Sequence, residues 1–491
     1  MIEICIKKHT TFVVISVGLA WAVAMPAQAF MFNVMSPVDA PDAIPGDGIC
    51  ATAGGFCTLR AAIDESNAAN NFPTAQIILP NDTYLLTLGE LAIRSSLFIT
   101  GSDPTATIID GGGNSRIFSI GDMGLSPIVN MSNLTISNGN GDSLVTGGGI
   151  FIKEGSSLGL FDSIVRDNQS RQFGGGISNE GFLQIVRSTI RDNQVPTDGG
   201  GGQTASGGGV FNFSTGSIQI DSSTISGNQA TRGGGIRNGG GRLNITNSTI
   251  SGNRATNRGG GIMTAGVTNI AYSTITDNEA NLRLGGIFTA EDRFGGGIYN
   301  DRGTVNIGNS ILAGNLDNRT EFDSDFAPDC YSVPPETTVL PGRFITSFRG
   351  NVVGVSNTNC VVRDTIYGTD ISFDQVGTTT TPLDPRLAPL ANNGGPTQTH
   401  ALLLGSPAID RGDGITSSTF FYSPATDQRG FPRPLDGNGD GVTVSDVGAY
   451  EAVPEPASTM GMFLFGGASW WLKRKQKTRK PWFPLIVASY R

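Results

Sequence analysis

The chain has 491 residues, of which 69 are glycine, 33 are Lys or Arg and 42 are Asp or Glu. Basic residues at the two ends mask how acidic the rest is, because residues 30–472 contain 24 Lys and Arg against 41 Asp and Glu, a net charge of about −17. This acidic part of the chain repels nucleic acid and anionic lipid. We therefore expect no nucleic-acid partner.

The first 29 residues have the composition of a secretory signal peptide. Two lysines precede the apolar run TFVVISVGLAWAVAM, and AQA supplies small residues at the positions that signal peptidase reads. A membrane anchor would need a longer apolar run. We therefore expect export, with signal peptidase as a partner. The residues that define the expected cleavage site are Ala27, Ala29 and Phe30.

Export leaves four cysteines in an oxidising compartment, where disulfides form. Four cysteines allow three connectivities, and loop-closure entropy favours the two local pairs, Cys50 with Cys57 and Cys330 with Cys360. The alternative is a metal site, but the chain has no CxxC spacing to support one.

A short helix is expected near the start of the exported chain. In CTLRAAIDES, Thr58 can cap the first turn. Four of the residues that follow would share one face of this helix, and that face could pack against the rest of the protein. The helix is therefore predicted to form a lid over the first turn of the fold. That face consists of Leu59, Ala62, Ile63 and Ser66. The segment DGICATAGGFCTLRAAIDESNAANN resembles the CSLREA motif that opens many bacterial surface β-helix proteins, with Thr58 in place of Ser and Ala61 in place of Glu.

The middle of the chain repeats a glycine-rich unit. Triple glycine followed by Ile or Val recurs six times, and an Asn closes each unit at spacings of 25, 35, 25, 25 and 37 residues. The two long intervals carry the insertions VPTDGGGGQTAS and LRLGGIFTAEDRF. A fixed period with loop insertions is typical of a solenoid.

Within a unit the hydrophobic pattern has period two, which indicates strands. In RLNITNSTISGN, Leu243 and Ile245 alternate with polar residues, and Ile250 follows after a break. Three short strands per unit predict an all-β fold, a right-handed parallel β-helix with coils ~4.8 Å apart. Thr246 and Thr249 should point outward. The side chains expected in the bore are Ile236, Leu243, Ile245, Ile250 and Ile262.

Two polar residues recur in fixed slots of the unit. A Ser column and an Asn column would stack coil on coil and form hydrogen bonds along the coil axis, as amide stacks do. Asn also tolerates the left-handed backbone that a sharp turn requires, and Gly does so more freely. The predicted columns include Ser188, Ser223, Ser248, Ser273, Asn193, Asn228, Asn253 and Asn278.

Two further stretches resemble surface proteins. GGGISN, GGGVFN, GGGIRN and GGGIYN resemble motifs of bacterial surface β-helix proteins, including polymorphic outer-membrane proteins. Downstream, DPRLAPLANNGGPTQTHALLLGSPAIDRGD with DQRGFPRPLDGNGDGVTVSDVGAYE is similar to the choice-of-anchor Q domain, a surface module found ahead of different C-terminal sorting signals. Together these resemblances imply a surface protein on a pectin-lyase-like solenoid.

The C-terminal segment VPEPASTMGMFLFGGASWWLKRKQK resembles the PEP-CTERM sorting signal. The apolar run at 460–472 has 13 residues, fewer than the ~20 of an ordinary membrane span. The resemblance implies transient retention at the inner membrane, cleavage by an exosortase, and release to the cell surface or the extracellular matrix. The residues that match the motif are Val453, Pro454, Glu455 and Pro456.

Many parallel β-helices cleave polysaccharides, so an enzymatic function is the alternative to a structural one. The body has one histidine, His400, so Ser-His-Asp chemistry and zinc hydrolysis are not expected. A calcium-dependent lyase would need only carboxylates and an Arg base. The recurring Asp167, Asp192 and Asp277 are better explained as a solvated edge that helps to cap the turn. The arginines expected as exposed rungs are Arg166, Arg191, Arg237 and Arg242.

One stretch resembles a calcium loop. DGNGDGVTVSDV places Asp436, Asn438 and Asp440 at positions 1, 3 and 5 of an EF-hand-type loop. Position 12 is Val447 rather than an acid, and Asp446 falls one residue early. Calcium at these three residues is the one cofactor hypothesis, and a metal-free surface loop is its alternative.

The sequence therefore predicts an exported surface or matrix protein with a structural or adhesive, non-catalytic role, for which extracellular polysaccharide is the candidate ligand. A polysaccharide lyase or hydrolase on the same scaffold is the alternative. The expected parts are a signal peptide (1–29), a CSLREA-like cap (30–70), β-helix repeats (71–365), a choice-of-anchor Q-like C-terminal part of the β-helix (366–452), and the sorting signal with its basic tail (453–491).

Overall fold

A computed structural model describes ten segments of the chain. They are residues 30–68, 74–122, 124–141, 146–196, 205–280, 295–317, 328–333, 345–364, 373–413 and 423–453. Five expected site residues lie outside these segments: Ala27, Ala29, Pro454, Glu455 and Pro456. Within the described segments, no helix has the length and apolar character needed to cross a bilayer.

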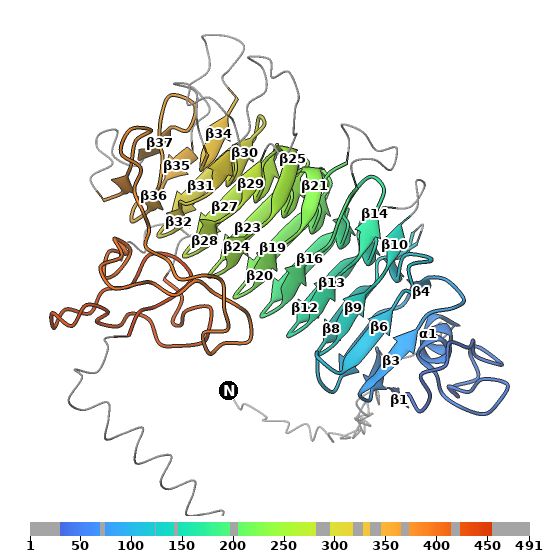
Figure 1. The fold of residues 1–491 in the computed structure, drawn as a ribbon. Helices are drawn as coiled ribbons and strands as arrows, with labels where there is room; N and C mark the ends of the chain where they lie inside the picture. Colours follow the sequence, from blue (N-terminus) through green and yellow to red (C-terminus); the bar gives the residue numbers. More distant parts are fainter. Residues whose placement is uncertain are drawn as a thin grey trace, which may run out of the picture.

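The chain winds into a right-handed parallel β-helix, the predicted fold class (Figure 1). A coil contributes one strand to each of three long sheets, here named A, B and C, and all their strand pairs are parallel. Equivalent residues of successive units lie opposite one another, as Ile220, Ile245 and Ile270 do in sheet A. The repeat period of the sequence is therefore the length of one coil.

Sheet A has 12 strands and the longest ones. They are β1 (Met31–Asn33), β2 (Ala75–Leu79), β5 (Leu97–Gly101), β8 (Ile128–Ser132), β12 (Ser157–Phe161), β16 (Phe182–Val186), β19 (Ser217–Asp221), β23 (Arg242–Thr246), β27 (Val267–Ala271), β31 (Thr304–Gly308), β35 (Ile345–Ser347) and β37 (Val362–Asp364).

Sheet B has 11 strands and follows sheet A after a tight turn. They are β3 (Asp82–Leu85), β6 (Thr107–Asp110), β9 (Thr135–Ser137), β13 (Ile164–Arg166), β17 (Thr189–Arg191), β20 (Thr224–Ser226), β24 (Thr249–Ser251), β28 (Thr274–Thr276), β32 (Ile311–Leu312), β36 (Val352–Val353) and β38 (Gln375–Val376).

Sheet C has nine strands, and six of them directly follow a glycine triplet. They are β4 (Leu91–Ile93), β7 (Phe118–Ile120), β11 (Ile150–Ile152), β15 (Ile177–Asn179), β18 (Val210–Asn212), β22 (Ile236–Asn238), β26 (Ile262–Thr264), β30 (Ile298–Asn300) and β34 (Cys330–Ser332). Two small sheets lie between B and C, made of β10 (Asn140–Gly141) with β14 (Gln169–Ser170), and of β21 (Gln229–Arg232), β25 (Arg254–Arg258), β29 (Glu279–Ala280) and β33 (Leu316–Asp317).

The bore is filled by aliphatic side chains from all three sheets. The five residues predicted to lie there are at most 1% exposed. Thr246 is half-buried on the outer side of β23, as expected for the alternation of a strand. Thr249 also lies on the outer side, next to the inward Ile250, but it is fully buried. Another part of the chain must therefore cover it.

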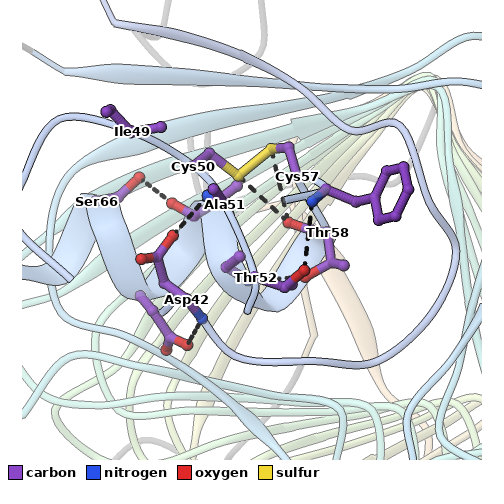
Figure 2. The surroundings of a disulfide bond; sticks show 12 residues. Asp42, Ile49, Cys50, Ala51, Thr52, Cys57, Thr58 and Ser66 are labelled. Atoms are coloured by element: carbon purple, nitrogen blue, oxygen red, sulfur yellow. Dashed lines mark hydrogen bonds between the residues drawn. A yellow bond between two sulfur atoms is a disulfide. The ribbon is translucent and has the colours of Figure 1, made fainter. Parts of the chain in front are cut away.

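The N-terminal end of the coil is closed by the predicted helix, α1 (Leu59–Ala68), which lies beside the first strands (Figure 1). Thr58 caps it by accepting a hydrogen bond of 3.1 Å from the amide of Ala61. The expected face is buried, and Glu65 is buried as well, since its carboxylate accepts hydrogen bonds from Gly46 and Gly48 at 2.6 Å each. A disulfide between Cys50 and Cys57 holds the preceding loop (Figure 2).

The region beyond residue 366 was expected to continue the β-helix, but most of it does not. β38 is the last strand that the structure describes in the long sheets. Residues 383–413 and 423–453, here called the C-terminal module, have isolated antiparallel bridges instead, such as Leu387 with Leu402. The module packs against the flank of the coil in Figure 1. Its many Gly, Pro and Asn residues favour turns over the regular strands that a coil needs.

Candidate functional site

The turn between sheet B and the next strand positions the recurring Asp residues and the Asn column. Asp167, Asp192 and Asp277 adopt φ values of 55° to 56°, so they supply the left-handed residue of the turn. In other coils Gly227 and Gly252 take the same slot, both with φ of 66°. The left-handed residue thus precedes the Asn, which corrects our expectation that the Asn itself adopts that conformation.

The Asn column lies inside the coil and forms a continuous amide ladder. Nδ2 of Asn228 donates to Oδ1 of Asn253 at 2.9 Å, and Asn253 repeats this contact to Asn278 at 2.9 Å. Each Oδ1 also accepts the backbone amide of the preceding Asn, as between Asn228 and Asn253 at 3.1 Å. These side chains are 0% exposed, so the column satisfies the buried amides of a turn that has no strand partner.

The Ser column forms a second ladder at the turn between sheets A and B. The backbone amide of Ser223 donates to Oγ of Ser248 at 3.1 Å, and Ser248 donates likewise to Ser273 at 3.2 Å. A third column, not predicted from the sequence, lies at the end of sheet C, where Nδ2 of Asn212 donates to Oδ1 of Asn238 at 3.0 Å. Its signal was the final Asn of the GGGISN-type motifs. The polar residues of the repeat therefore form hydrogen bonds between successive coils.

The two local cysteine pairs are both disulfide bonds. Cys330 and Cys360 join β34 to the loop before β37, across 30 residues of sequence. Cys330 is fully buried, so this bond lies in the wall of the last coils.

The C-terminal module docks on the outer face of sheet B. In β20 and β24, Thr is followed by inward Ile and outward Ser, and these outward residues are at most 8% exposed. Oγ1 of Thr224 donates to the carbonyl of Gln398 at 2.6 Å. The amide of Ala449 donates to Oγ1 of Thr274 at 3.1 Å. The module thus covers a stripe of hydroxyl groups on sheet B.

The sequence does contain a signal for this stripe. In β13 and β17 the outward residue before the turn is Arg, whereas β20 and β24 end in Ser226 and Ser251. Arg191 is 38% exposed at its side chain, whereas Ser251 is 2% exposed. From β13 to β24, the change from Arg to Ser coincides with the start of the covered part, but β9 also ends in Ser, at Ser137, so a terminal Ser alone is not the signal.

A cleft of about 680 Å³ remains where the module meets sheet B. The expected acidic edge contributes to it, together with polar residues of the module. Among its lining residues are Arg191, Asp192, Asp277, Asn392, Thr397 and Gln398. Nη1 of Arg191 pairs with Asp192 at 2.5 Å. The third recurring acid, Asp167, lies outside this cleft and pairs with Arg166.

His400 lies beside this cleft and contacts Ser251, an arrangement that the sequence analysis did not foresee. Nε2 of His400 is 2.8 Å from Oγ of Ser251, and Nδ1 is 2.7 Å from the carbonyl of Ala388. Burial lowers the pKa of His400, although the Ala388 carbonyl and Asp277 act in the opposite direction. A neutral ring with the proton on Nδ1 donates to Ala388 and accepts from Ser251.

The contact between Ser251 and His400 does not have the geometry of a catalytic triad. The carboxylate of Asp277 lies 3.9 Å from Nε2, the same nitrogen that contacts Ser251. In a Ser-His-Asp triad the acid instead binds the other ring nitrogen. Ser251 and His400 are each 2% exposed. The contact therefore fixes the module to sheet B.

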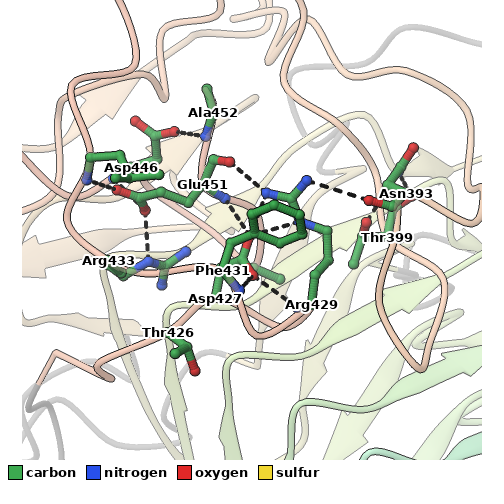
Figure 3. Close-up of polar contacts among 12 residues, drawn as sticks. Asn393, Thr399, Thr426, Asp427, Arg429, Phe431, Arg433, Asp446, Glu451 and Ala452 are labelled. Atoms are coloured by element: carbon green, nitrogen blue, oxygen red, sulfur yellow. Dashed lines mark hydrogen bonds and ion pairs between the residues drawn. The ribbon is translucent and has the colours of Figure 1, made fainter. Parts of the chain in front are cut away.

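The interior of the module is a buried network of charges (Figure 3). Nε of Arg433 donates to Glu451 at 2.7 Å, and Arg429 pairs with Asp427 at 2.6 Å. Asp446 is fully buried and accepts the amide of Asp410 at 2.7 Å. Burial raises the pKa of Asp446 to about 7, with a smaller contribution from nearby Glu451.

The predicted calcium loop is folded around its own backbone amides. Asp436 accepts from Gly439 at 2.7 Å and from Gly441 at 2.9 Å, and Asn438 donates to Asp440 at 3.1 Å. Asp446 turns into the module and does not complete the loop. Over the described segments, no three His, Cys, Asp or Glu side chains are grouped closely enough to hold a metal ion. Calcium at this loop stays a hypothesis.

Of the four arginines that were expected to be exposed, one is largely buried. Arg242 is exposed, and Arg166 and Arg191 are partly exposed beside their Asp neighbours. Arg237 is only 14% exposed at its side chain, so it is not a solvated rung. Its strand, β22, lies between two strands with large outward side chains, Phe211 and Met263, which shield it from water.

Together these features define a right-handed parallel β-helix with a C-terminal module docked on one flank. Residues 247–265, which span most of one coil, match the Chlamydia polymorphic membrane protein repeat. Among solved structures, the crystal structure of pectate lyase Pel9A is similar to 88% of this chain and 98% of that one, with 12% sequence identity and a TM-score of 0.43. The comparison with curated proteins finds no match.

Proposed function

We propose that the protein is an exported cell-surface or extracellular-matrix rod with a structural or adhesive role and no catalytic activity. The observation that carries this proposal is how the polar side chains of the coil are used. The Ser and Asn columns bind successive coils together, and the hydroxyl stripe of sheet B binds the C-terminal module. These contacts are structural, and the recurring acids cap turns.

The match of one coil to a repeat of a membrane protein family supports a surface location. We further propose that signal peptidase removes residues 1–29 and that an exosortase recognises the Pro-Glu-Pro triplet. Extracellular polysaccharide is the proposed ligand class, nucleic acid is not a partner, and the loop at Asp436 binds calcium at most as an accessory ion.

Sorting is tested by replacing Pro454, Glu455 and Pro456 with alanine. We expect uncleaved protein to accumulate in the inner membrane, detected by fractionation and intact-mass measurement. The matched control replaces Pro481 and Pro484 in the basic tail and should be processed normally. Unchanged release of the triplet variant would refute the sorting proposal.

The alternative function is a polysaccharide lyase or hydrolase. The cleft beside Asp192 and Asp277 is the feature that favours it, because it brings acids and an arginine to one open surface. We expect no unsaturated product from pectate or alginate, with or without calcium. A steady rate of product formation that is abolished by Asp192→Asn or Arg191→Gln, but not by Arg242→Gln, would establish the enzyme instead.

A further inference from the structure

Three arginines gather at the corner between the small sheet of β21 and sheet C, on neighbouring coils. Arg232 ends β21 and is paired in register with Arg258, which ends β25. Arg237 lies outward in β22, a few residues after Arg232. We name these three residues the arginine cluster. It is unusual here because the body of the protein is strongly acidic.

Two buried arginines elsewhere in the described chain contact carboxylates closely. Nε of Arg433 lies 2.7 Å from Glu451, and Nε of Arg60 lies 2.6 Å from Asp39. Such pairs compensate the loss of hydration that a buried guanidinium suffers.

The arginine cluster lacks this close compensation at two of its members. Nη2 of Arg237 lies 3.9 Å from Asp301, at the outer limit of an ion pair. Nε of Arg232 is buried and has no hydrogen-bond partner. Burial lowers the pKa of both Arg232 and Arg237. A neighbouring arginine also lowers each pKa, whereas Asp301 acts in the opposite direction on both. Arg232 and Arg237 are thus partly desolvated positive groups, and Nε of Arg232 is an unused donor.

The surroundings strengthen any anion contact made there. Phe211 and Met263 lie opposite Arg237 in the neighbouring strands. The guanidinium of Arg258 lies 5.2 Å from the ring centre of Tyr299. Apolar and aromatic walls lower the local dielectric constant, so hydrogen bonds from a guanidinium to an oxyanion become stronger than in water.

We propose that the arginine cluster binds an oxyanion group of an acidic polysaccharide, either a uronate carboxylate or a sulfate ester. The guanidinium group presents its donors in a planar fork that matches both groups. The polysaccharide part of this inference rests on the proposed surface location, whereas oxyanion binding rests on the cluster alone. The acidic remainder of the body repels polyanions, which confines their binding to this corner.

The test measures binding of the full chain to oligogalacturonate, to heparin oligosaccharides and to neutral dextran, with calcium chelated. We expect the chain to bind oligogalacturonate, heparin or both, and not dextran. Arg232→Gln and Arg258→Gln should each weaken binding about tenfold, the effect of losing a charge-assisted hydrogen bond. Binding of one acidic glycan alone supports the proposal and identifies the group.

The matched control is Arg242→Gln, which removes the same charge from an exposed site on sheet A of the same coil. It should leave binding unchanged, and thermal unfolding midpoints should show that all variants are folded. Arg232→Lys should retain more heparin binding than Arg232→Gln, because it keeps the charge.

Several results would overturn the inference: no binding of either acidic glycan, equal binding of dextran, or equal weakening by Arg242→Gln. A chain that binds no oxyanion but is sorted to the surface and turns over no glycan would overturn this inference alone. The proposed function would then stand.

Discussion

Oγ1 of Thr249 donates a hydrogen bond of 2.7 Å to Oε1 of Gln428, although 179 residues separate them in sequence. Nε2 of the same amide donates to Oγ1 of Thr224 at 2.9 Å, one coil away. All three residues are at most 1% exposed. Gln428 therefore joins two coils of sheet B to the C-terminal module at the centre of their interface.

Gln428→Ala should loosen the module without unfolding the coil. The change leaves the buried hydroxyl of Thr249 without this acceptor, at about 1–3 kcal/mol, whereas Thr224 keeps its bond to the carbonyl of Gln398. Limited proteolysis should cut within residues 383–453 faster, and hydrogen exchange should accelerate there. The control is Gln219→Ala, at an exposed position of sheet A. Equal protection of the module in both variants would contradict this role.

Ile250→Asp should destabilise the whole coil. Ile250 is fully buried in the bore, where a carboxylate has no partner, so we expect a loss of several kcal/mol in the free energy of unfolding. Thr246→Asp, on the outer side of the preceding strand, should cost less than about 1 kcal/mol. Urea unfolding compares the two variants. Similar losses would mean that the inward and outward registers are wrongly assigned.

Asn253→Ala should cost more than Asn244→Ala, although both asparagines form stacked amide contacts. Asn253 is fully buried and contacts both neighbouring coils, whereas Asn244 is half-buried and accepts a bond of 2.8 Å from Asn269 on the outer face. We expect a loss of about 2–5 kcal/mol at Asn253 and about 1 kcal/mol at Asn244. Equal unfolding midpoints would show that the inner ladder contributes little.

The contribution of Asp446 to stability should fall as the pH rises from about 4 to 7. The pKa of its buried carboxyl is raised from 3.8 to about 7, so the folded state favours the protonated form. That contribution is fully present below the unfolded pKa and is lost as the pH rises through the folded one. Asp446→Asn, which cannot titrate, should flatten the profile measured by urea unfolding.

The control for this pH profile is Asp440→Asn, at an exposed position of the neighbouring loop. It should reproduce the profile of the parent protein. A profile that Asp446→Asn leaves unchanged between pH 4 and 7 would contradict the assignment.

The repeat made the coil predictable, because period-two alternation and fixed polar slots are local properties of each unit. Ile250 was placed in the bore and Ser248 in its column from spacing alone. The cysteine pairs followed from short loops. The burial of Thr249 could not be predicted in the same way, since the chain that covers it lies far away in sequence.

The same reason explains the contact between Ser251 and His400, which depends on how the module folds back. The partial burial of Arg237 depends on its neighbours in the adjacent coils, Phe211 and Met263, rather than on its own unit. Local patterns therefore predicted the columns, whereas contacts between distant segments decided where the surface is covered and where it is charged.

The Asn column has a direction and an end. Each amide donates toward the C-terminus, and Nδ2 of Asn315 donates the final bond, of 3.0 Å, to Oδ1 of the buried Asp329. An ionised carboxylate has acceptors but no donor, so the chain of aligned amides stops there. Gene duplication can thus add a coil before Asp329 and preserve every bond of the Asn column, whereas a coil added after Asp329 would meet a terminus that cannot donate onward. The Asn column can therefore be lengthened only by coils added on the N-terminal side of Asp329.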